Sequence, residues 1–534
     1  MAPMLVRNAK VFTGEGEDFA SAFRVEGGRF TWVGHDTDLP AAAPDEQTFD
    51  LGGATVLPGL LDVHTHPGLV STLVDAVQAL PPAVSSIADL LDALRASPQL
   101  GSAGAWVEGH GYDDARFPEG RSPTRHDLDE VSDTQPIFVR RCDAHTAVVN
   151  TPALRLAGIT RATPDPEGAE IGRDEHGEPD GRLREPAAMD LVLDHAPVVS
   201  AAQRIARMAR LGEHYLARGI VGAGDLAATF VPEPLASFRA ARTTTWLPRL
   251  GLYPIWQHIK DAPPVLTDDD RTGEVFIAGV KVLLDGAYSN ATAWTHDPYP
   301  GTCDHGIRTT TPEELTDAGA WARANGVQLA VHAMGDAAID AVLDEFADQE
   351  GWLDGVPSVR IEHATLFSPA MIARVRDARM PIAIVSHTIF FHAEYRAYEA
   401  NLSADQARIA YPIRSFHAAL PHTALASDSP ATAHSEADNV FVSVQAAVDR
   451  RAWTGAEFGP HEAVTVAQAL ELYTGRAATC MPLAGLGRIE PGFEGSFVVL
   501  DRDVFSVPTD EIHTVQVDQT WVRGNRAWTR AETE

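Results

Sequence analysis

The chain has 534 residues, of which 74 are acidic and 42 basic, and its formal net charge of −32 argues against nucleic acid or an anionic membrane surface as a partner. Its hydrophobic fraction of 45% is ordinary for a soluble globular protein, and it contains no uncharged apolar stretch of about 18 residues, the length of a membrane span. The three cysteines are far apart and form no CxxC pair, which argues against a disulfide framework and a thiolate metal cluster. Without a signal-peptide pattern, we expect a cytoplasmic enzyme.

The two ends of the chain share short alternating strands and glycine-containing turns. This pattern covers residues 1–56, with segments such as SAFRVEGGRFTWVGH, and residues 485–534, with segments such as TVQVDQTWVRGNRAW. Alternation between glycine turns is typical of antiparallel strands. We therefore predict one small β-sandwich domain assembled from both termini.

Between these ends, residues 57–484 alternate short apolar strands with alanine-rich amphipathic segments. The predicted strands are LLDVH, GIVGAGD, PRLGLYP, GVKVLLDG, VQLAVHAMGD, VRIEHATL, IAIVSHT and TALASDSP. The predicted helices include AAQRIARMARLGEHYLARG, TPEELTDAGAWARANG, DAAIDAVLDEFADQE and SPAMIARVRDAR. Eight buried strands with helices between them predict an α/β fold, a parallel (β/α)8 TIM-like barrel.

A long insertion separates the first and second predicted barrel strands. It covers about residues 70–210 and contains its own strand, PIFVRR, together with helical stretches and a polar loop. A segment inserted after a barrel strand lies on the carboxyl-terminal face, where active sites are built. We interpret it as a lid or a substrate-shaping element.

Histidines and acids stand at the ends of particular predicted strands. In LLDVHTHPG, residues two apart point to the same side of a strand, so His64 and His66 share a face. Asp62 lies on the same face and is a candidate for orienting one of these histidines. Later strands carry further candidates at or near their carboxyl ends: Lys281, His332, His363 and Asp428. Barrel geometry would bring these side chains to one mouth.

This mixture of side chains suits a catalytic metal. Imidazole and carboxylate ligands bind zinc and similar divalent ions, and a catalytic site keeps one position open for water. The metal lowers the pKa of bound water towards ~7, and a nearby carboxylate can take up the proton. Asp428 is placed for that role, with Ser427 and Ser429 as hydrogen-bond partners.

The motifs PGLLDVHTH, VKVLLDGAYSNATA, VQLAVHAMGDAAIDAVLD, RIEHATL and ALASDSP resemble, in order, those of the amidohydrolase superfamily. More narrowly, they are similar to its amidohydrolase-3 branch, which includes the N-substituted formamide deformylases. The resemblance extends to HGYDDARFP, DAHTAVVNTPAL, GRLRE, YPIRSF and ALELYTGRAATCMPLAGLGRIEPGFEGSFVVLDRD, and so covers nearly the whole chain.

The resemblance implies a metal-dependent hydrolase that holds one or two divalent ions, with zinc as the expected metal. His64 and His66 would bind the more buried ion, and His332 and His363 would bind the second. Asp428 would act as both ligand and proton shuttle, so that Asp428, His332 and His363 are the expected catalytic residues.

The lysine of the fourth strand has two interpretations. In many relatives this lysine is carboxylated by CO₂ and bridges two metals, and Lys281 is the matching residue. Alternatively, an unmodified Lys281 pairs with Asp285 inside the barrel. An unmodified lysine would repel a cation, so the bridging role requires the carbamate.

Substrate-binding candidates come from the same resemblance: His145, Asp285, His387 and Glu185. A packed histidine is the alternative for His145, and a lid-borne ion pair with Arg184 is the alternative for Glu185. His387 lies in IVSHTIFFH, where many members of the branch carry a Gln-Pro pair, so substrate preference can differ.

We expect hydrolysis of a C–N bond in an amide, a formamide or a cyclic amide by metal-bound hydroxide, with Asp428 passing the proton to the departing nitrogen. The expected partner is a small-molecule amide-type substrate, and a homodimer fits this architecture. Two alternatives stay open: a mononuclear deaminase or ester hydrolase on the same barrel, and a non-catalytic binding scaffold.

Overall fold

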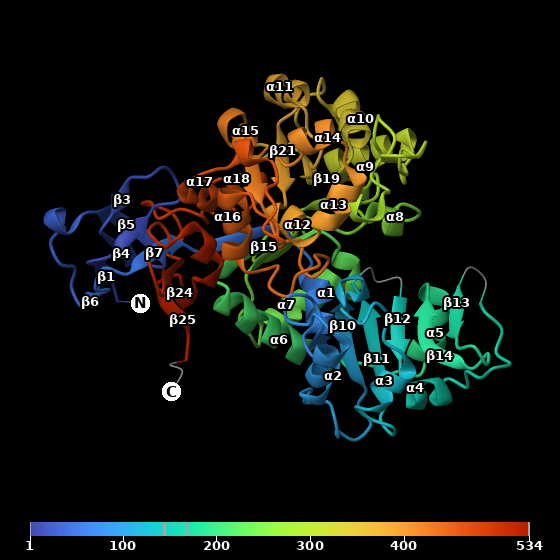
Figure 1. Ribbon diagram of the computed structural model, residues 1–534. Helices are drawn as coiled ribbons and strands as arrows, with labels where there is room; N and C mark the ends of the chain where they lie inside the picture. Colours follow the sequence, from blue (N-terminus) through green and yellow to red (C-terminus); the bar gives the residue numbers. More distant parts are fainter. Residues whose placement is uncertain (1, 143–145, 167–168, 532–534) are drawn as a thin grey trace. The chain divides into compact units, whose positions relative to one another are not determined.

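A computed structural model of the chain describes residues 2–142, 146–166 and 169–531 (Figure 1). The chain divides into two compact units. The first comprises Met1–Leu69, Met208–Pro430 and Ala437–Glu534, and the second comprises Val70–Arg207 and Ala431–Glu436. In the described part of the chain, no helix combines the length and apolar character needed to cross a membrane.

The eight predicted central strands are all present in the first unit. They are β8 (Leu60–Thr65), β15 (Ile220–Asp225), β16 (Arg249–Leu252), β18 (Gly279–Leu283), β19 (Gln328–Ala333), β20 (Val359–His363), β21 (Ile382–Ser386) and β22 (Thr423–Leu425). They form two parallel sheets, β17–β16–β15–β8 and β18–β19–β20–β21–β22. Strand β17 (Val275–Ile277) is an addition that the sequence pattern did not predict.

The hydrogen-bonded ladders of the described strands form two sheets that do not close into one cylinder, so the α/β fold is confirmed while the closed (β/α)8 barrel stays a prediction. At one seam a single bridge joins Ile255 to Lys281. At the other, β22 is only three residues long, and its Leu425 N–H donates to the Leu472 carbonyl at 3.0 Å. The Leu61 N–H of β8 likewise donates to the Tyr473 carbonyl at 2.9 Å. The 472–473 segment therefore satisfies strand groups that a closed barrel would pair with each other.

Helices alternate with these strands. The helices from residue 201 onward are α6 (Ala201–Ala217), α7 (Pro234–Arg242), α8 (Trp256–Ile259), α9 (Pro312–Asn325), α10 (Asp336–Phe346), α11 (Pro369–Asp377), α12 (Thr388–Ala393), α13 (Tyr395–Asn401), α14 (Ala404–Ile409), α15 (Ile413–Ala419), α16 (Val440–Asp449), α17 (Val466–Glu471) and α18 (Ala477–Cys480). Both ends of α9 are marked by residues that commonly begin or end helices. Thr311 and Glu314 form a capping box, Pro312 occupies the first turn, and Gly326 ends the helix at φ +62°. The result is a fold of alternating α and β elements, as predicted.

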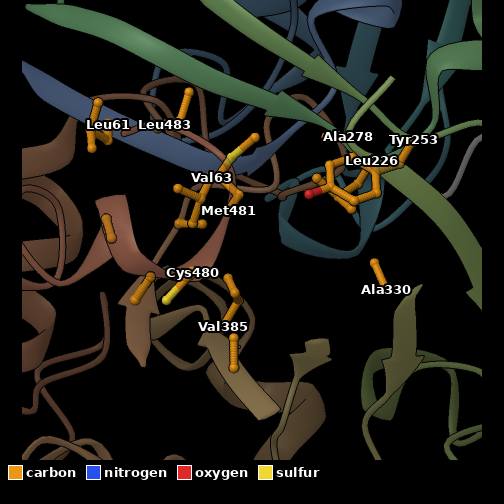
Figure 2. Packing of buried hydrophobic residues seen from close by; sticks show 14 of the residues in the cluster. Leu61, Val63, Leu226, Tyr253, Ala278, Ala330, Val385, Cys480, Met481 and Leu483 are labelled. Carbon is orange, nitrogen blue, oxygen red and sulfur yellow. The ribbon is translucent and has the colours of Figure 1, made fainter. Parts of the chain in front are cut away.

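An apolar cluster packs between the parallel strands and α18. Figure 2 shows Leu61 and Val63 of β8 and Val385 of β21 together with Cys480 and Met481. All of these side chains are buried, and full burial of a Val- or Leu-sized side chain contributes about 1.5–3 kcal/mol. This packing anchors β8 next to the polar residues at its carboxyl end.

The second unit contains a six-stranded sheet of order β13–β14–β12–β11–β10–β9. Its strands are β9 (Val77–Gln78), β10 (Val107–Tyr112), β11 (Ile137–Arg141), β12 (Thr146–Val149), β13 (Glu170–Arg173) and β14 (Pro179–Arg184), and its helices include α2 (Ile87–Arg95), α3 (Arg125–Asp129), α4 (Thr151–Leu156) and α5 (Pro186–Leu193). Strand β11 lies within the predicted segment PIFVRR. Two apolar clusters give this unit a core of its own. The function of this insertion as a lid stays a prediction.

Residues from both ends of the chain form two further sheets in the first unit. One consists of β5 (Arg29–Gly34), β4 (Ala22–Glu26), β1 (Met4–Arg7) and β6 (Gln47–Asp50). The other consists of β25 (Asn525–Thr529), β24 (Val517–Val522), β23 (Phe497–Leu500), β7 (Thr55–Pro58), β2 (Lys10–Phe12) and β3 (Phe19–Ala20). Val25, Val56 and Phe497 belong to one apolar cluster that includes residues of both sheets. Assignment of these sheets as a β-sandwich stays a prediction.

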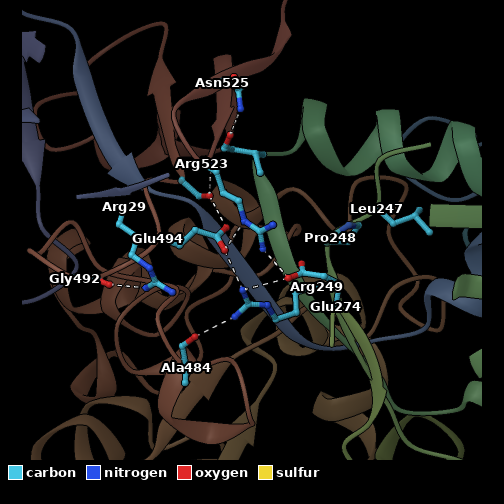
Figure 3. A network of polar contacts seen from close by, with 12 residues as sticks. Arg29, Leu247, Pro248, Arg249, Glu274, Ala484, Gly492, Glu494, Arg523 and Asn525 are labelled. Atoms are coloured by element: carbon cyan, nitrogen blue, oxygen red, sulfur yellow. Dashed lines mark hydrogen bonds and ion pairs between the residues drawn. The ribbon is translucent and has the colours of Figure 1, made fainter. Parts of the chain in front are cut away.

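A charged network connects these terminal sheets to the parallel strands (Figure 3). The carboxylate of Glu494 lies 2.9 Å from Arg249 Nη2 and 3.0 Å from Arg523 Nε. Arg523 also contacts Glu274 at 2.6 Å. The Glu494 carboxylate contacts the guanidinium groups of Arg249 and Arg523, and its side chain is only 12% exposed. We therefore expect Glu494 to stabilise the junction between the terminal sheets and the parallel strands.

We predict that Glu494→Gln lowers the free energy of unfolding by about 1–3 kcal/mol, because a neutral amide cannot accept two charge-assisted hydrogen bonds as strongly. Urea denaturation measures the change. The control is Glu350→Gln, whose partner Arg379 and own side chain are 64% and 68% exposed, and which should change stability by less than about 0.5 kcal/mol. Equal changes in the two variants would contradict the assignment.

Candidate metal centre

The two histidines of the HTH motif meet one carboxylate. His64 Nε2 lies 3.1 Å, and His66 Nε2 lies 2.8 Å, from the same oxygen, Asp428 Oδ1. The candidate ligand atoms of these three residues all lie within 4.8 Å of one another. We call them the Asp428 group. The structure thus brings together three of the predicted metal ligands.

Backbone hydrogen bonds hold Asp428 beside β8. The Asp428 N–H donates to the His64 carbonyl at 2.9 Å. The Ser429 carbonyl accepts from the His66 N–H at 2.9 Å and from Thr65 Oγ1 at 3.0 Å. Asp428 itself adopts φ +54°, a left-handed conformation that costs an ordinary residue about 1–3 kcal/mol. These bonds fix that conformation at the end of β22.

The carboxyl group of Asp428 is ionised at neutral pH. Burial by itself would raise its pKa, but the neighbouring His64 and His66 outweigh burial through charge and hydrogen bonding. Together they hold the pKa of Asp428 well below its usual range. The group can therefore accept a proton during a reaction.

Asp62 holds Ser427 and the main chain of His64 by hydrogen bonds, so its contact with this histidine is to the backbone. Its carboxylate accepts hydrogen bonds from Ser427 Oγ at 2.5 Å and from the Ser427 N–H at 3.1 Å. Burial raises the pKa of Asp62 to about 7, although these bonds oppose the rise. The pairing of β8 with β15 shifts register between Asp62 and Thr65, and such a bulge interrupts the alternation on which the prediction was based.

A buried ion pair, which the sequence analysis missed, positions His64. His64 Nδ1 lies 2.6 Å from Glu362 Oε2, and Arg360 Nε donates to Glu362 Oε1 at 2.7 Å. Arg360 also donates to the Val63 carbonyl at 2.9 Å and to the Tyr253 hydroxyl at 3.0 Å. Burial would raise the pKa of Glu362, but Arg360 and then His64 overcome it and keep the pKa well below its usual range. Two charged residues at alternate positions of the buried strand VRIEH were the sequence signal for this pair.

A second set of imidazoles adjoins the Asp428 group. The ligand atoms of His64, His363 and His387 also lie within 4.8 Å of one another, and we call them the histidine trio. The ring centroid of His332 is 4.2 Å from that of His363. His363 ends β20 at φ +70°, which turns the chain out of the regular alternation of the strand. His332 Nε2 lies 3.0 Å from the Gly286 carbonyl.

Burial favours the neutral form of these imidazoles, which is the form that binds metals. It lowers the pKa of His332 to about 4, with Lys281 adding to the effect. It lowers the pKa of His387 to about 3, with a further contribution from His64. It also lowers the pKa of His363 well below its usual range.

Lys281 and Asp285 are not partners in the described contacts, which argues against the ion-pair interpretation. The carboxylate of Asp285 instead accepts three backbone N–H groups, those of Trp294 at 3.0 Å, Met334 at 3.1 Å and Gly335 at 2.9 Å. Asp285 therefore organises the loops that follow β18 and β19. Lys281 is buried in β18, and burial lowers its pKa to about 8 against the opposing charges of Glu362 and Asp428.

The remaining substrate-binding candidates come from the long insertion in the sequence. His145 lies outside the described residues. Glu185 is exposed and follows β14 at φ +67°. Arg184 forms an exposed ion pair with Glu170 at 2.8 Å.

The donor set fits a divalent cation. His66 Nδ1, His363 Nδ1 and His387 Nε2 are buried and have no hydrogen-bond partner within the described residues. A buried nitrogen without a partner costs about 1–3 kcal/mol, which a cation can recover by accepting its lone pair. Imidazole nitrogens together with a carboxylate are ligands typical of zinc and related metals.

Comparison with known proteins agrees with this fold. The model of the amidohydrolase family matches residues 47–527. The chain is 31% identical to the N-substituted formamide deformylase of Arthrobacter pascens over 98% of each protein. It is 28% identical to the protein LONG AFTER FAR-RED 3 of Arabidopsis thaliana over 99% of this chain and 92% of that protein. The crystal structure of an uncharacterized metal-dependent hydrolase from Pyrococcus horikoshii OT3 has the same fold, with a TM-score of 0.73 and 23% identity over 95% of this chain and 99% of that one.

The chain therefore belongs to the amidohydrolase family. It is an enzyme that acts on carbon–nitrogen bonds other than peptide bonds. The resemblance inferred from the strand-end motifs is confirmed.

The depressed pKa of His387 predicts a pH-dependent stability in the metal-free protein. The unfolded ring takes up a proton below about pH 6.5, whereas the native ring stays neutral to near its pKa of about 3. The unfolded state thus binds more protons in this window, and stability is lost as the pH falls.

In urea denaturation after chelator treatment, the wild-type chain should lose roughly 3 kcal/mol more than His387→Asn between pH 7 and pH 4. The comparison isolates the ring because asparagine does not titrate there. If the free energy of unfolding fell equally in the two proteins between pH 7 and pH 4, the prediction would be wrong, because the native ring of His387 would then take up its proton at the same pH as the unfolded ring.

Proposed function

We propose that this amidohydrolase is metal-dependent and hydrolyses the C–N bond of an amide, a formamide or a cyclic amide. The observation that carries the proposal is the convergence of His64, His66 and Asp428 at the carboxyl ends of parallel strands. We take the two parallel sheets as parts of one (β/α)8 barrel, in which this end is where active sites lie. The similarity to an N-substituted formamide deformylase supports the choice of bond.

Bound at these ligands, a divalent cation such as zinc would supply a Lewis acid and a water-derived nucleophile at neutral pH. Hydrolysis adds one water across the bond: the carbonyl carbon gains oxygen, the C–N bond breaks, and the nitrogen leaves with a proton. Asp428 is the residue to move that proton, because it is ionised and its Oδ1 faces both histidines. It would accept the proton from water and donate it to the leaving nitrogen.

Glu362 and Arg360 act on the reaction through His64. The hydrogen bond from Nδ1 to Glu362 fixes the ring so that Nε2 faces the centre. Arg360 keeps the carboxylate ionised inside the protein. Such partners of metal-binding histidines affect metal affinity by about 10–100-fold.

Carboxylation of Lys281 is a further part of the proposal. Carbamate formation requires the neutral amine, whose nitrogen attacks CO₂ and loses a proton. A pKa of about 8 leaves roughly one tenth of the amine neutral at pH 7. Two ions per chain would support the bridging carbamate. One ion and an unmodified Lys281 would favour a mononuclear deaminase or ester hydrolase.

The substrate class, the location, the assembly and the insertion complete the proposed function. We propose a small-molecule substrate, a cytoplasmic location and a homodimer. His145 and Glu185 stay candidates for substrate binding from the insertion, which we propose to be a lid.

We predict that Asp428→Asn lowers turnover of the best N-formyl or N-acyl amine by about 10²–10⁴-fold, because asparagine cannot carry the proton. Steady-state kinetics on a panel of formamides, amides, lactams and esters identifies that substrate and measures the loss. The matched control is Asp348→Asn on an exposed part of the chain, which should leave turnover unchanged.

Metal content and circular dichroism accompany both variants. Near-wild-type turnover in Asp428→Asn with unchanged metal content would contradict the shuttle role. A wild-type protein that binds metal but hydrolyses no member of the panel would instead support the binding-scaffold alternative.

A further inference from the structure

His387, directly after β21, has one ring nitrogen engaged and the other without a partner. The side chain is fully buried, and Nδ1 lies 3.0 Å from the Ala426 carbonyl. Because a carbonyl only accepts hydrogen bonds, Nδ1 carries the proton and Nε2 keeps its lone pair. The backbone of the segment after β22 therefore fixes the tautomer of this ring.

The lone pair on Nε2 of His387 is not used by any of the described residues. Nε2 of His387 has no hydrogen-bond partner among residues 2–142, 146–166 and 169–531, and Nδ1 of His363 is in the same state. The ligand atoms of His64, His363 and His387 nevertheless lie within 4.8 Å of one another. Imidazole nitrogens that converge in this way have the arrangement of ligands around a cation.

The surrounding packing holds these rings in place. The Phe390 ring stacks on His387 with a centroid distance of 5.0 Å and an interplanar angle of 20°. It also stacks on His363 at 5.8 Å and 21°. Phe390 is only 6% exposed and offers neither nitrogen a hydrogen bond. The stack therefore orients the two rings without occupying Nδ1 of His363 or Nε2 of His387.

We propose that His387 is a direct metal ligand through Nε2, binding a divalent cation together with His64 and His363. The inference rests on the metal dependence proposed above and extends it by a ligand at the end of the seventh strand. It also revises the predicted role of His387 in substrate binding. An all-imidazole trio favours zinc, cobalt, nickel or copper over magnesium or calcium. His64 belongs to both groups, so the trio and the Asp428 group are parts of one centre.

Two substitutions of His387 distinguish metal binding through Nε2 from the hydrogen bond that Nδ1 makes to the Ala426 carbonyl. In His387→Asn, the side-chain amide can still donate to the Ala426 carbonyl where Nδ1 does, but nothing replaces Nε2. In His387→Gln, the amide oxygen can reach the position of Nε2, but the bond to Ala426 is lost. The control is His392→Asn in α12, whose Nδ1 lies 2.9 Å from the Arg451 carbonyl and which belongs to neither group.

The experiment titrates chelator-stripped full-length protein with Zn²⁺ in competition with a chromophoric chelator, and with Co²⁺ followed by its visible absorption. We expect zinc affinity to fall by at least about 100-fold in His387→Asn, less in His387→Gln and not at all in His392→Asn, because even a residue that only orients a ligand costs 10–100-fold. The cobalt spectrum of His387→Asn should lose intensity or shift. Circular dichroism verifies the fold of each variant.

Zinc affinity within threefold of wild type in His387→Asn would overturn the inference while leaving the proposed function intact. So would a greater loss in His387→Gln than in His387→Asn, since that order indicates that only the bond to Ala426 matters. A wild-type chain that binds no metal ion would overturn both the inference and the proposed metal dependence.

Discussion

The hydrogen bond between His64 Nδ1 and Glu362 is the contact on which the rest of the site depends. Both side chains are buried, and a carboxylate in such surroundings needs a positive partner, which Arg360 provides. With Nδ1 engaged, His64 has Nε2 left for the centre; this nitrogen lies 3.1 Å from Asp428 Oδ1, and His64 belongs to both candidate ligand groups. One buried ion pair in β20 thus determines which ring nitrogen of His64 is left for the candidate centre.

The other residues of the candidate centre lie at or just after the ends of strands. Asp428 and His363 both sit in left-handed backbone conformations at the ends of β22 and β20. Asp428 is secured by the bonds between residues 64–66 and 428–429, and Asp62 holds the preceding Ser427. The Ala426 carbonyl fixes the ring of His387. Nδ1 of His64, Nδ1 of His387 and the backbone N–H of Asp428 are therefore engaged by the protein itself, which is the arrangement of a preorganised site.

The sequence predicted the strands and most residues of the candidate centre because buried parallel strands are continuous apolar runs and their polar ends are easy to locate. It did not predict Arg360 and Glu362, since alternation shows that two charged residues share a face but not that they neutralise each other there. Nor could periodicity reveal the bulge between Asp62 and Thr65, the left-handed turn at His363, or the 472–473 segment at the barrel seam. These depend on backbone angles and on contacts between residues far apart in the chain.

The central claim is that this constellation hydrolyses a C–N bond only when it holds a metal. The most direct measurement is the rate of N-formyl amine hydrolysis by chelator-stripped protein as zinc is returned, with bound metal counted by mass spectrometry at each point. The account predicts negligible activity without metal and a rate that rises in proportion to bound ion until the centre is filled. Full activity in protein carrying less than about a tenth of an ion per chain would contradict it.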